Sequence, residues 1–305
     1  EALTLQELKS GNVPAWAKPR SVRYASGKKW QVFRHSRVNA DQMKKGVGML
    51  RGAIKSPTDE ADRPFFILQL GRHLTDLDAD AYAYQTLTRM QMLPPDTPHD
   101  RKTYMLPTLD AVKREGQFHL LRILARNMLG GEASSYFDAL VPQNGYERVR
   151  IAECYALLGE QQKAEALLPT AHGSGNPEQG FSDFFVRLRG AVLARSLGNN
   201  ELARQLADPV LKNGPKAQKW PQYQSTWEIL DTLMKNVDSG KSSGQWTLKN
   251  GSYRGTCRGF VGPVTVQVRI ANGALDTVKV VKTQDDRPWS AMEVMPQRIE
   301  RRKSL

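Results

Sequence analysis

Two patterns of apolar residues divide the chain. Between residues 40 and 236, apolar side chains recur every three or four positions, as they do on one face of a helix. Between 264 and 270 they recur at every second position, which is typical of a strand with one buried face. We therefore predict a helical region followed by a small α+β domain.

The helical region contains two copies of one pattern. The segments 152–171 and 191–211 each hold Leu-Gly followed, after four further residues, by Ala. We expect Gly159 and Gly198 to end a first helix in a left-handed cap, and the alanines Ala152, Ala164, Ala191 and Ala203 to let helices pack closely. The segments 74–94 and 124–142 predict looser helical hairpins.

The two copies resemble the tetratricopeptide repeat. Tyr155 stands four residues before Gly159, and Pro215 stands twelve after Ala203, as in that repeat. The tryptophan expected early in the repeat is missing, and the glycines are farther apart than one repeat. The resemblance implies an α-solenoid whose concave face binds another protein, with a structural spacer as the alternative.

The alternating run leads into a predicted hairpin. Asn272-Gly273 lies between two strand-like segments, which is a strong hairpin signal. A loop of three residues, 271–273, would place Val266 opposite Val278 and Val264 opposite Val280, with Gly273 left-handed in a bulge. A strand and not a helix follows the glycines before this run, so a phosphate loop of the dinucleotide-binding type is excluded.

The segment 248–289 as a whole resembles the FMN-binding domain of extracytoplasmic flavin subunits in ion-translocating NADH and ferredoxin oxidoreductases. The matching residues are Asn250-Gly251-Ser252-Tyr253, Gly255, Gly259-Phe260, Gly262-Pro263, Asn272-Gly273 and Leu275. The resemblance implies an FMN, often joined through its phosphate to a threonine in a Ser/Thr-Gly-Ala-Thr loop by a flavin transferase. The chain to Leu305 holds no such loop, so we expect either a truncated domain, which we favour, or an incomplete one without flavin.

The resemblance also supplies candidate cofactor-binding residues. They are Tyr253, Gly259, Phe260, Gly262, Pro263, Arg287 and Trp289. Arg287 would contact a phosphate or a flavin carbonyl, or else pair with a nearby aspartate. Trp289 would stack on the flavin ring or fill the small core. Gly259 and Gly262 would bring the backbone near the cofactor or only permit a tight turn.

The net charge of +13 raises the question of nucleic acid. The segment 9–37 is basic without any acidic residue and is interleaved with four aromatic residues, a combination that grips single strands. We favour a basic arm or hairpin, docked through its aromatic residues or facing an acidic protein partner, over nucleic-acid binding. The histidines are scattered without paired spacing, so no metal site is expected.

The sequence contains few signals that indicate the compartment in which the protein resides. The longest apolar runs are far shorter than the roughly 20 residues that span a bilayer, so no transmembrane segment is expected. The start at Glu1-Ala2 without methionine favours removal of a signal peptide, although an incomplete chain would start in the same way. Cys154 and Cys257 lie in different predicted domains, which argues against a disulfide framework.

These observations give four predicted parts. Residues 1–39 form a basic arm or hairpin, 40–236 a helical-repeat domain resembling a tetratricopeptide solenoid, 237–246 a linker, and 247–305 a truncated FMN-binding domain. We expect an extracytoplasmic electron-transfer subunit that carries FMN and docks through its repeats in a larger membrane-associated redox complex. The alternative is a non-catalytic scaffold whose last domain binds no flavin.

Overall fold

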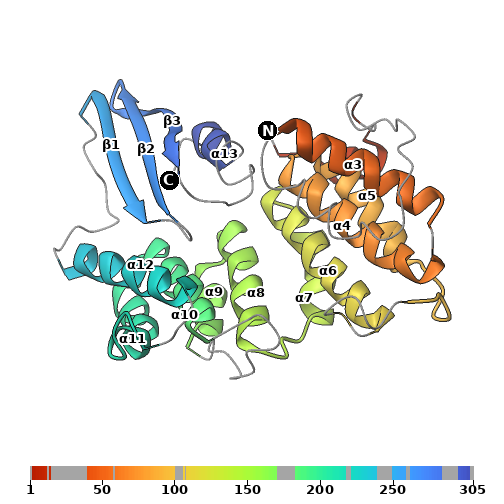
Figure 1. Ribbon diagram of the computed structural model, residues 1–305, viewed down its shortest axis with the longest axis horizontal. Coiled ribbons are helices and arrows are strands. Elements are labelled where there is room, and N and C mark those ends of the chain that lie inside the picture. The colour runs from red at the N-terminus through yellow and green to blue at the C-terminus, as the bar shows by residue number, and fades with distance from the viewer. Residues whose placement is uncertain are drawn as a thin grey trace. The chain divides into compact units, whose positions relative to one another are not determined.

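The computed structural model describes most of the chain (Figure 1). The described residues are 2–11, 14, 40–57, 59–99, 106, 108–169, 183–217, 221–238, 249–258, 262–283 and 295–302. They fall into two compact units, one up to Val141 and one from Pro142 onward. Most of the predicted basic segment and the predicted linker from 239 on lie outside the described residues.

The first unit is helical. Its elements are α1 (Leu5–Ser10), α3 (Ala40–Lys55), the 3-10 turn η2 (Glu60–Asp62), α4 (Arg63–Asp76), α5 (Asp80–Gln91), α6 (Leu109–Arg126) and α7 (Gly130–Ala139). From α3 to α7 each helix packs against the next one along the chain, and α1 packs against α5. Side-chain caps start several of these elements: Thr4 forms a capping box with Glu7, and Thr108 accepts a hydrogen bond from the backbone of Ala111.

The second unit combines helices with a sheet. Its elements are α8 (Gly145–Leu157), α9 (Gln161–Leu167), α10 (Asp183–Ser196), α11 (Asn200–Leu211), α12 (Pro221–Asp238), β1 (Gly251–Arg258), β2 (Pro263–Ala271), β3 (Ala274–Thr283) and α13 (Met295–Arg302). A helical region followed by a small antiparallel sheet is therefore confirmed. The tetratricopeptide solenoid and the domain boundaries stay predictions.

One helix ending recurs at four turns, those of α4–α5, α6–α7, α8–α9 and α10–α11. At each turn one residue has a left-handed backbone, with φ of 57°, 61°, 76° and 83° in Asp78, Met128, Gly159 and Gly198. The following residue then donates its N–H to the carbonyl five positions earlier, at 2.9 to 3.0 Å. The predicted left-handed caps at the two glycines are confirmed, and two further caps of the same form use residues other than glycine.

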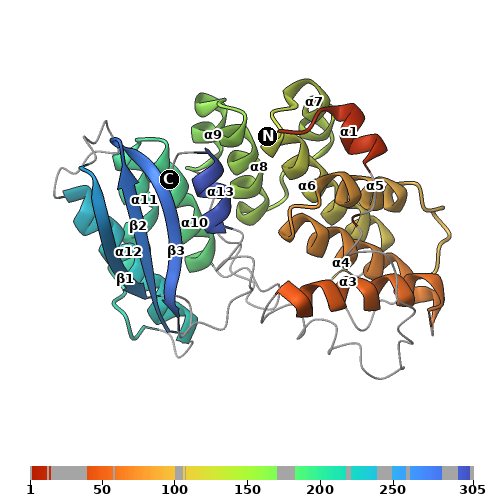
Figure 2. The ribbon, with the colours of Figure 1, turned by 90° about the horizontal axis from the view of Figure 1, so that it is seen from above.

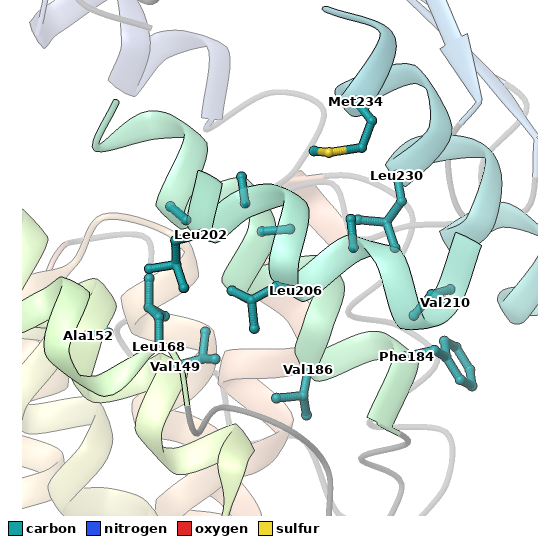
Figure 3. Close-up of a cluster of buried hydrophobic side chains, with 14 of the residues drawn as sticks. Val149, Ala152, Leu168, Phe184, Val186, Leu202, Leu206, Val210, Leu230 and Met234 are labelled. Atoms are coloured by element: carbon teal, nitrogen blue, oxygen red, sulfur yellow. The ribbon is translucent and has the colours of Figure 1, made fainter. Parts of the chain in front are cut away.

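Helices α8 to α12 of the second unit share one apolar core (Figure 3). The four small residues predicted to allow close packing, Ala152, Ala164, Ala191 and Ala203, are all completely buried. In α12 the ring of Tyr223 packs edge-on against Phe184, with 5.2 Å between ring centroids, and its hydroxyl donates to the carbonyl of Val210 at 3.2 Å. The buried hydroxyl is thus satisfied without breaking the apolar packing.

The sheet is an antiparallel meander in the order β1-β2-β3 (Figure 2). The predicted loop of three residues between β2 and β3 is wrong, because Ala271 pairs with Ala274 and only two residues form the turn. Those two residues, Asn272 and Gly273, have φ of 54° and 70°. Gly273 is left-handed as predicted, and the turn has the form that Asn-Gly favours.

The predicted register is wrong for the same reason. Val280 faces Val266, and Val278 faces Val268. The residue that brings these valines to one side of the sheet is Asp276, which bulges within β3 where the pairing shifts between Arg269 and Ile270. The extra residue was predicted in the loop, whereas it lies within β3, beyond the two pairs Ala271–Ala274 and Ile270–Leu275.

Candidate functional site

The sheet has an apolar side and a polar side. Residues directly opposite each other in an antiparallel pair share a side, so the register assigns each strand residue to one of them. The apolar side carries Tyr253, Gly255, Val266, Val268, Ile270, Leu275, Val278 and Val280. The polar side carries Ser252, Arg254, Thr256, Thr265, Gln267, Arg269, Thr277, Lys279 and Lys282.

Helix α13 covers part of the apolar side. Ile299 packs against a small core in which Ile270, Leu275 and Val278 are buried. The carboxylate of Glu300 accepts a hydrogen bond from the backbone N–H of Val278 at 2.6 Å. Because β3 is an edge strand of the described sheet, this bond fixes α13 to the edge as well as to the face.

The apolar side is open along β1. Every residue from Gly251 to Thr256 is exposed, and the large side chain of Tyr253 is 49 % exposed. Its hydroxyl donates to the carbonyl of Lys249 at 2.9 Å, which orients the ring beside Gly251. The result is an oriented aromatic ring on a sheet surface that faces solvent.

Gly255 lies two residues along the same strand, beside Tyr253 on the apolar side and opposite Val266. A methyl group added there would meet no atom within 4 Å. Glycine in a strand interior weakens the strand and supplies nothing to pack. Neither internal crowding nor a left-handed backbone requires glycine here, and the space above this backbone is open.

One side chain joins the start of β1 to the β2–β3 turn, which lie at the same end of the sheet. The amide oxygen of Asn250 accepts a hydrogen bond from the backbone N–H of Gly273 at 3.0 Å. Asn250 immediately precedes β1, and Gly273 closes the β2–β3 turn. The bond therefore fixes the start of β1, close to Tyr253, to the β2–β3 turn beside it.

The charged strand residues lie on the other side of the sheet. There Arg254 donates to Gln267, which donates to Ser252, both at 2.9 Å, and Arg269 pairs with Asp276 at 3.1 Å. Within the described strands, no charged residue lies on the apolar side.

Only three of the seven predicted cofactor-binding residues lie among the described residues. Tyr253 lies on the open apolar surface. Gly262 is buried and Pro263, exposed, begins β2, a strand position that tolerates proline. Gly259, Phe260, Arg287 and Trp289 lie outside the described residues, so their roles stay predictions.

Gly255 was not among the seven cofactor-binding residues predicted from the sequence, although it is one of the positions that resemble FMN-binding domains. The sequence held only a weak signal, because Gly255 is one of the positions that match the FMN-binding domain, and no strand was predicted there. The sequence alone could not show that the space above Gly255 is open. This open space shows that internal packing does not require a glycine at this position.

The geometry suits binding of a flat apolar group more than acid–base chemistry. Tyr253 offers an aromatic face, Gly255 a bare stretch of backbone, and Val266 an apolar floor. A flat aromatic ring such as the isoalloxazine of FMN would rest where a side chain at residue 255 would otherwise stand. The hydroxyl of Tyr253 is already engaged with Lys249 and serves to orient the ring.

Comparison with known proteins identified no relative. No family model, curated protein or solved structure matches the chain. Among the helices of the described segments, none is both long and apolar enough to cross a bilayer.

Proposed function

We propose that the sheet and α13 form part of an FMN-binding domain, and that the protein acts as an electron-transfer subunit. The observation that carries the proposal is the open apolar strip of β1, where an oriented Tyr253 stands beside a glycine that internal packing does not require. The resemblance of 248–289 to FMN-binding domains also supports it, and Tyr253 and Gly255 both belong to the matching positions.

In this proposal the chain's residues hold and orient the cofactor. Tyr253 would contact the ring face, Gly255 would admit it close to the backbone, and Val266 would lie beneath it. When bound, FMN supplies a centre that takes up one or two electrons, and the protein tunes it by burial and hydrogen bonding. Arg287 and Trp289 remain candidates for the phosphate and the ring.

The helical regions would serve as the docking part. We propose that they hold the flavin domain in a larger membrane-associated redox complex on the extracytoplasmic side. The exposed apolar side chains Met92, Val141 and Val192 are available for such contacts in the described helical segments and their connections.

The test begins with the complete coding sequence, expressed together with a flavin transferase. We expect a yellow protein whose visible flavin absorbance, if the link is covalent, survives denaturation and removal of small molecules. A colourless product, given an active transferase, contradicts the flavin proposal and favours the scaffold without flavin.

A pair of variants tests the surface itself. Gly255→Val adds a side chain into open space and favours the strand conformation, so the fold should be as stable as the parent or more so while flavin binding falls at least tenfold. Thr256→Val is the matched control, because Thr256 neighbours Gly255 but lies on the polar side, bonded to Thr265. Equal flavin content in all three proteins would show that this strip is not the binding surface.

A further inference from the structure

The first unit contains a cavity that the flavin proposal does not use. Its volume is about 190 Å³, and it lies among α3, α4 and α5. The lining residues are Arg51, Ile54, Lys55, Ile67, Leu70, Tyr82, Thr86 and Arg89. Its walls are therefore mainly apolar, with three basic side chains and no acidic one.

The basic groups lie towards the solvent side of this cavity. Leu70 and Thr86 are buried, whereas Lys55 and Arg89 are exposed and Arg51 is half-buried. The described residues provide no ion-pair partner for Lys55 or Arg89. An apolar interior beneath a cationic mouth is complementary to a molecule with an apolar body and an anionic head.

Tyr82 lies between the apolar interior of the cavity and its cationic mouth. The guanidinium of Arg51 lies over its ring, 5.4 Å from the centroid. Burial raises the pKa of the Tyr82 phenol, while the positive charges of Arg51 and Arg89 act in the opposite direction. Both arginines thus favour negative charge at the phenol, and a bound anion at that point would experience the same attraction.

The size of the cavity limits the ligand. An apolar cavity of about 150 Å³ accepts benzene, so this one has room for a single ring or a short branched chain plus a small head group. A carboxylate matches the planar fork of an arginine better than a spherical anion does. We propose that the cavity binds a small monocarboxylic acid with an aromatic or branched aliphatic body, its carboxylate held by Arg51, Lys55 and Arg89.

Isothermal titration of the whole chain with phenylacetate tests the proposal. A ligand of about ten non-hydrogen atoms in a matching site should bind with a Kd on the order of 1 mM or tighter. Phenylacetamide has the same shape without the charge, and we expect it to bind at least about tenfold more weakly. Equal affinity for acid and amide, or no binding of the acid at about 10 mM, would overturn the proposal.

Three variants locate the binding. Arg89→Gln should weaken phenylacetate about fivefold or more and leave phenylacetamide unchanged. Arg72→Gln is the matched control, because Arg72 is also exposed but does not line the cavity. Ile67→Trp should fill the cavity and abolish binding of both probes, while far-UV circular dichroism verifies that the helices remain folded. If Arg89→Gln and Arg72→Gln bind phenylacetate with the same affinity, the ligand does not bind in this cavity.

Discussion

Gly71 allows a test of the packing between α4 and α5. It lies in α4, is buried, and faces Leu87 of α5, which is also buried. A methyl group at residue 71 would stand 2.4 Å from Cδ2 and 2.6 Å from Cγ of Leu87. Optimal contacts between carbon atoms are at about 3.5 to 4.0 Å, and Cγ is too close to its backbone to turn away. The helices would therefore have to separate by about 1 Å.

Two opposing effects set the size of the change. Alanine favours a helix over glycine by about 1 kcal/mol, whereas overpacking costs about 1–3 kcal/mol. We expect Gly71→Ala to lower the free energy of unfolding by about 1 kcal/mol, within a range of about 0–2 kcal/mol, measured by urea denaturation followed by circular dichroism. Gly48→Ala in α3 is the control, because a methyl group there meets nothing within 4 Å and should stabilise by about 0.5–1 kcal/mol.

A double-mutant cycle separates the clash from other effects. Leu87→Ala alone should cost about 2–5 kcal/mol as a cavity forms, but it also removes the atoms that clash. Gly71→Ala introduced into that background should then stabilise, giving a coupling energy of about 2 kcal/mol. If Gly71→Ala stabilises the parent protein as much as Gly48→Ala does, the described packing of α4 on α5 is incorrect.

Three further predictions concern stability. Met128→Gly should raise the free energy of unfolding by about 1 kcal/mol, because Met128 has φ of 61° and is 60 % exposed, and Gly159→Ala should lower it by a similar amount, both read from urea denaturation. Glu300→Ala should remove the bond to the N–H of Val278 and cost about 1–2 kcal/mol, seen as faster amide exchange in β3, whereas unchanged exchange would contradict the role of α13. Burial lowers the pKa of His73 from its ordinary 6.5, so the unfolded chain binds more protons, and stability is complete above about pH 6.5 and falls as the pH drops below it. His73→Gln should remove that part of the pH dependence in urea titrations at about pH 7.5 and 5.5, and an unchanged pH slope would count against it.

The sequence predicted the features that depend on local periodicity. The spacing of apolar residues predicted the helical region from residue 40 onward and the strands β2 and β3, and Gly159 and Gly198 identified two helix endings, whereas α1 and β1 were not predicted. The same ending at Asp78 and Met128 was not predicted, because neither residue is glycine, which adopts this backbone most freely.

The sequence was less informative where one residue changes a register. Alternation showed that the valines of β2 and β3 share one side, but a bulge at Asp276 and an extra loop residue restore that alternation equally well. For the candidate site, Tyr253 followed from the family resemblance. The significance of Gly255 required the empty space above it, which only a three-dimensional arrangement can reveal.

Because Glu300 binds the backbone N–H of Val278, the two edge strands of the described sheet, β1 and β3, differ in their capacity to pair with a further strand. On β3 a carboxylate occupies a backbone donor that a neighbouring strand would need. On β1 the residues from Gly251 to Thr256 are exposed, and their outward peptide groups can accept a fourth strand. Growth of the sheet is thereby directed to one border, and a strand added there would become the rim of the apolar strip that contains Tyr253 and Gly255.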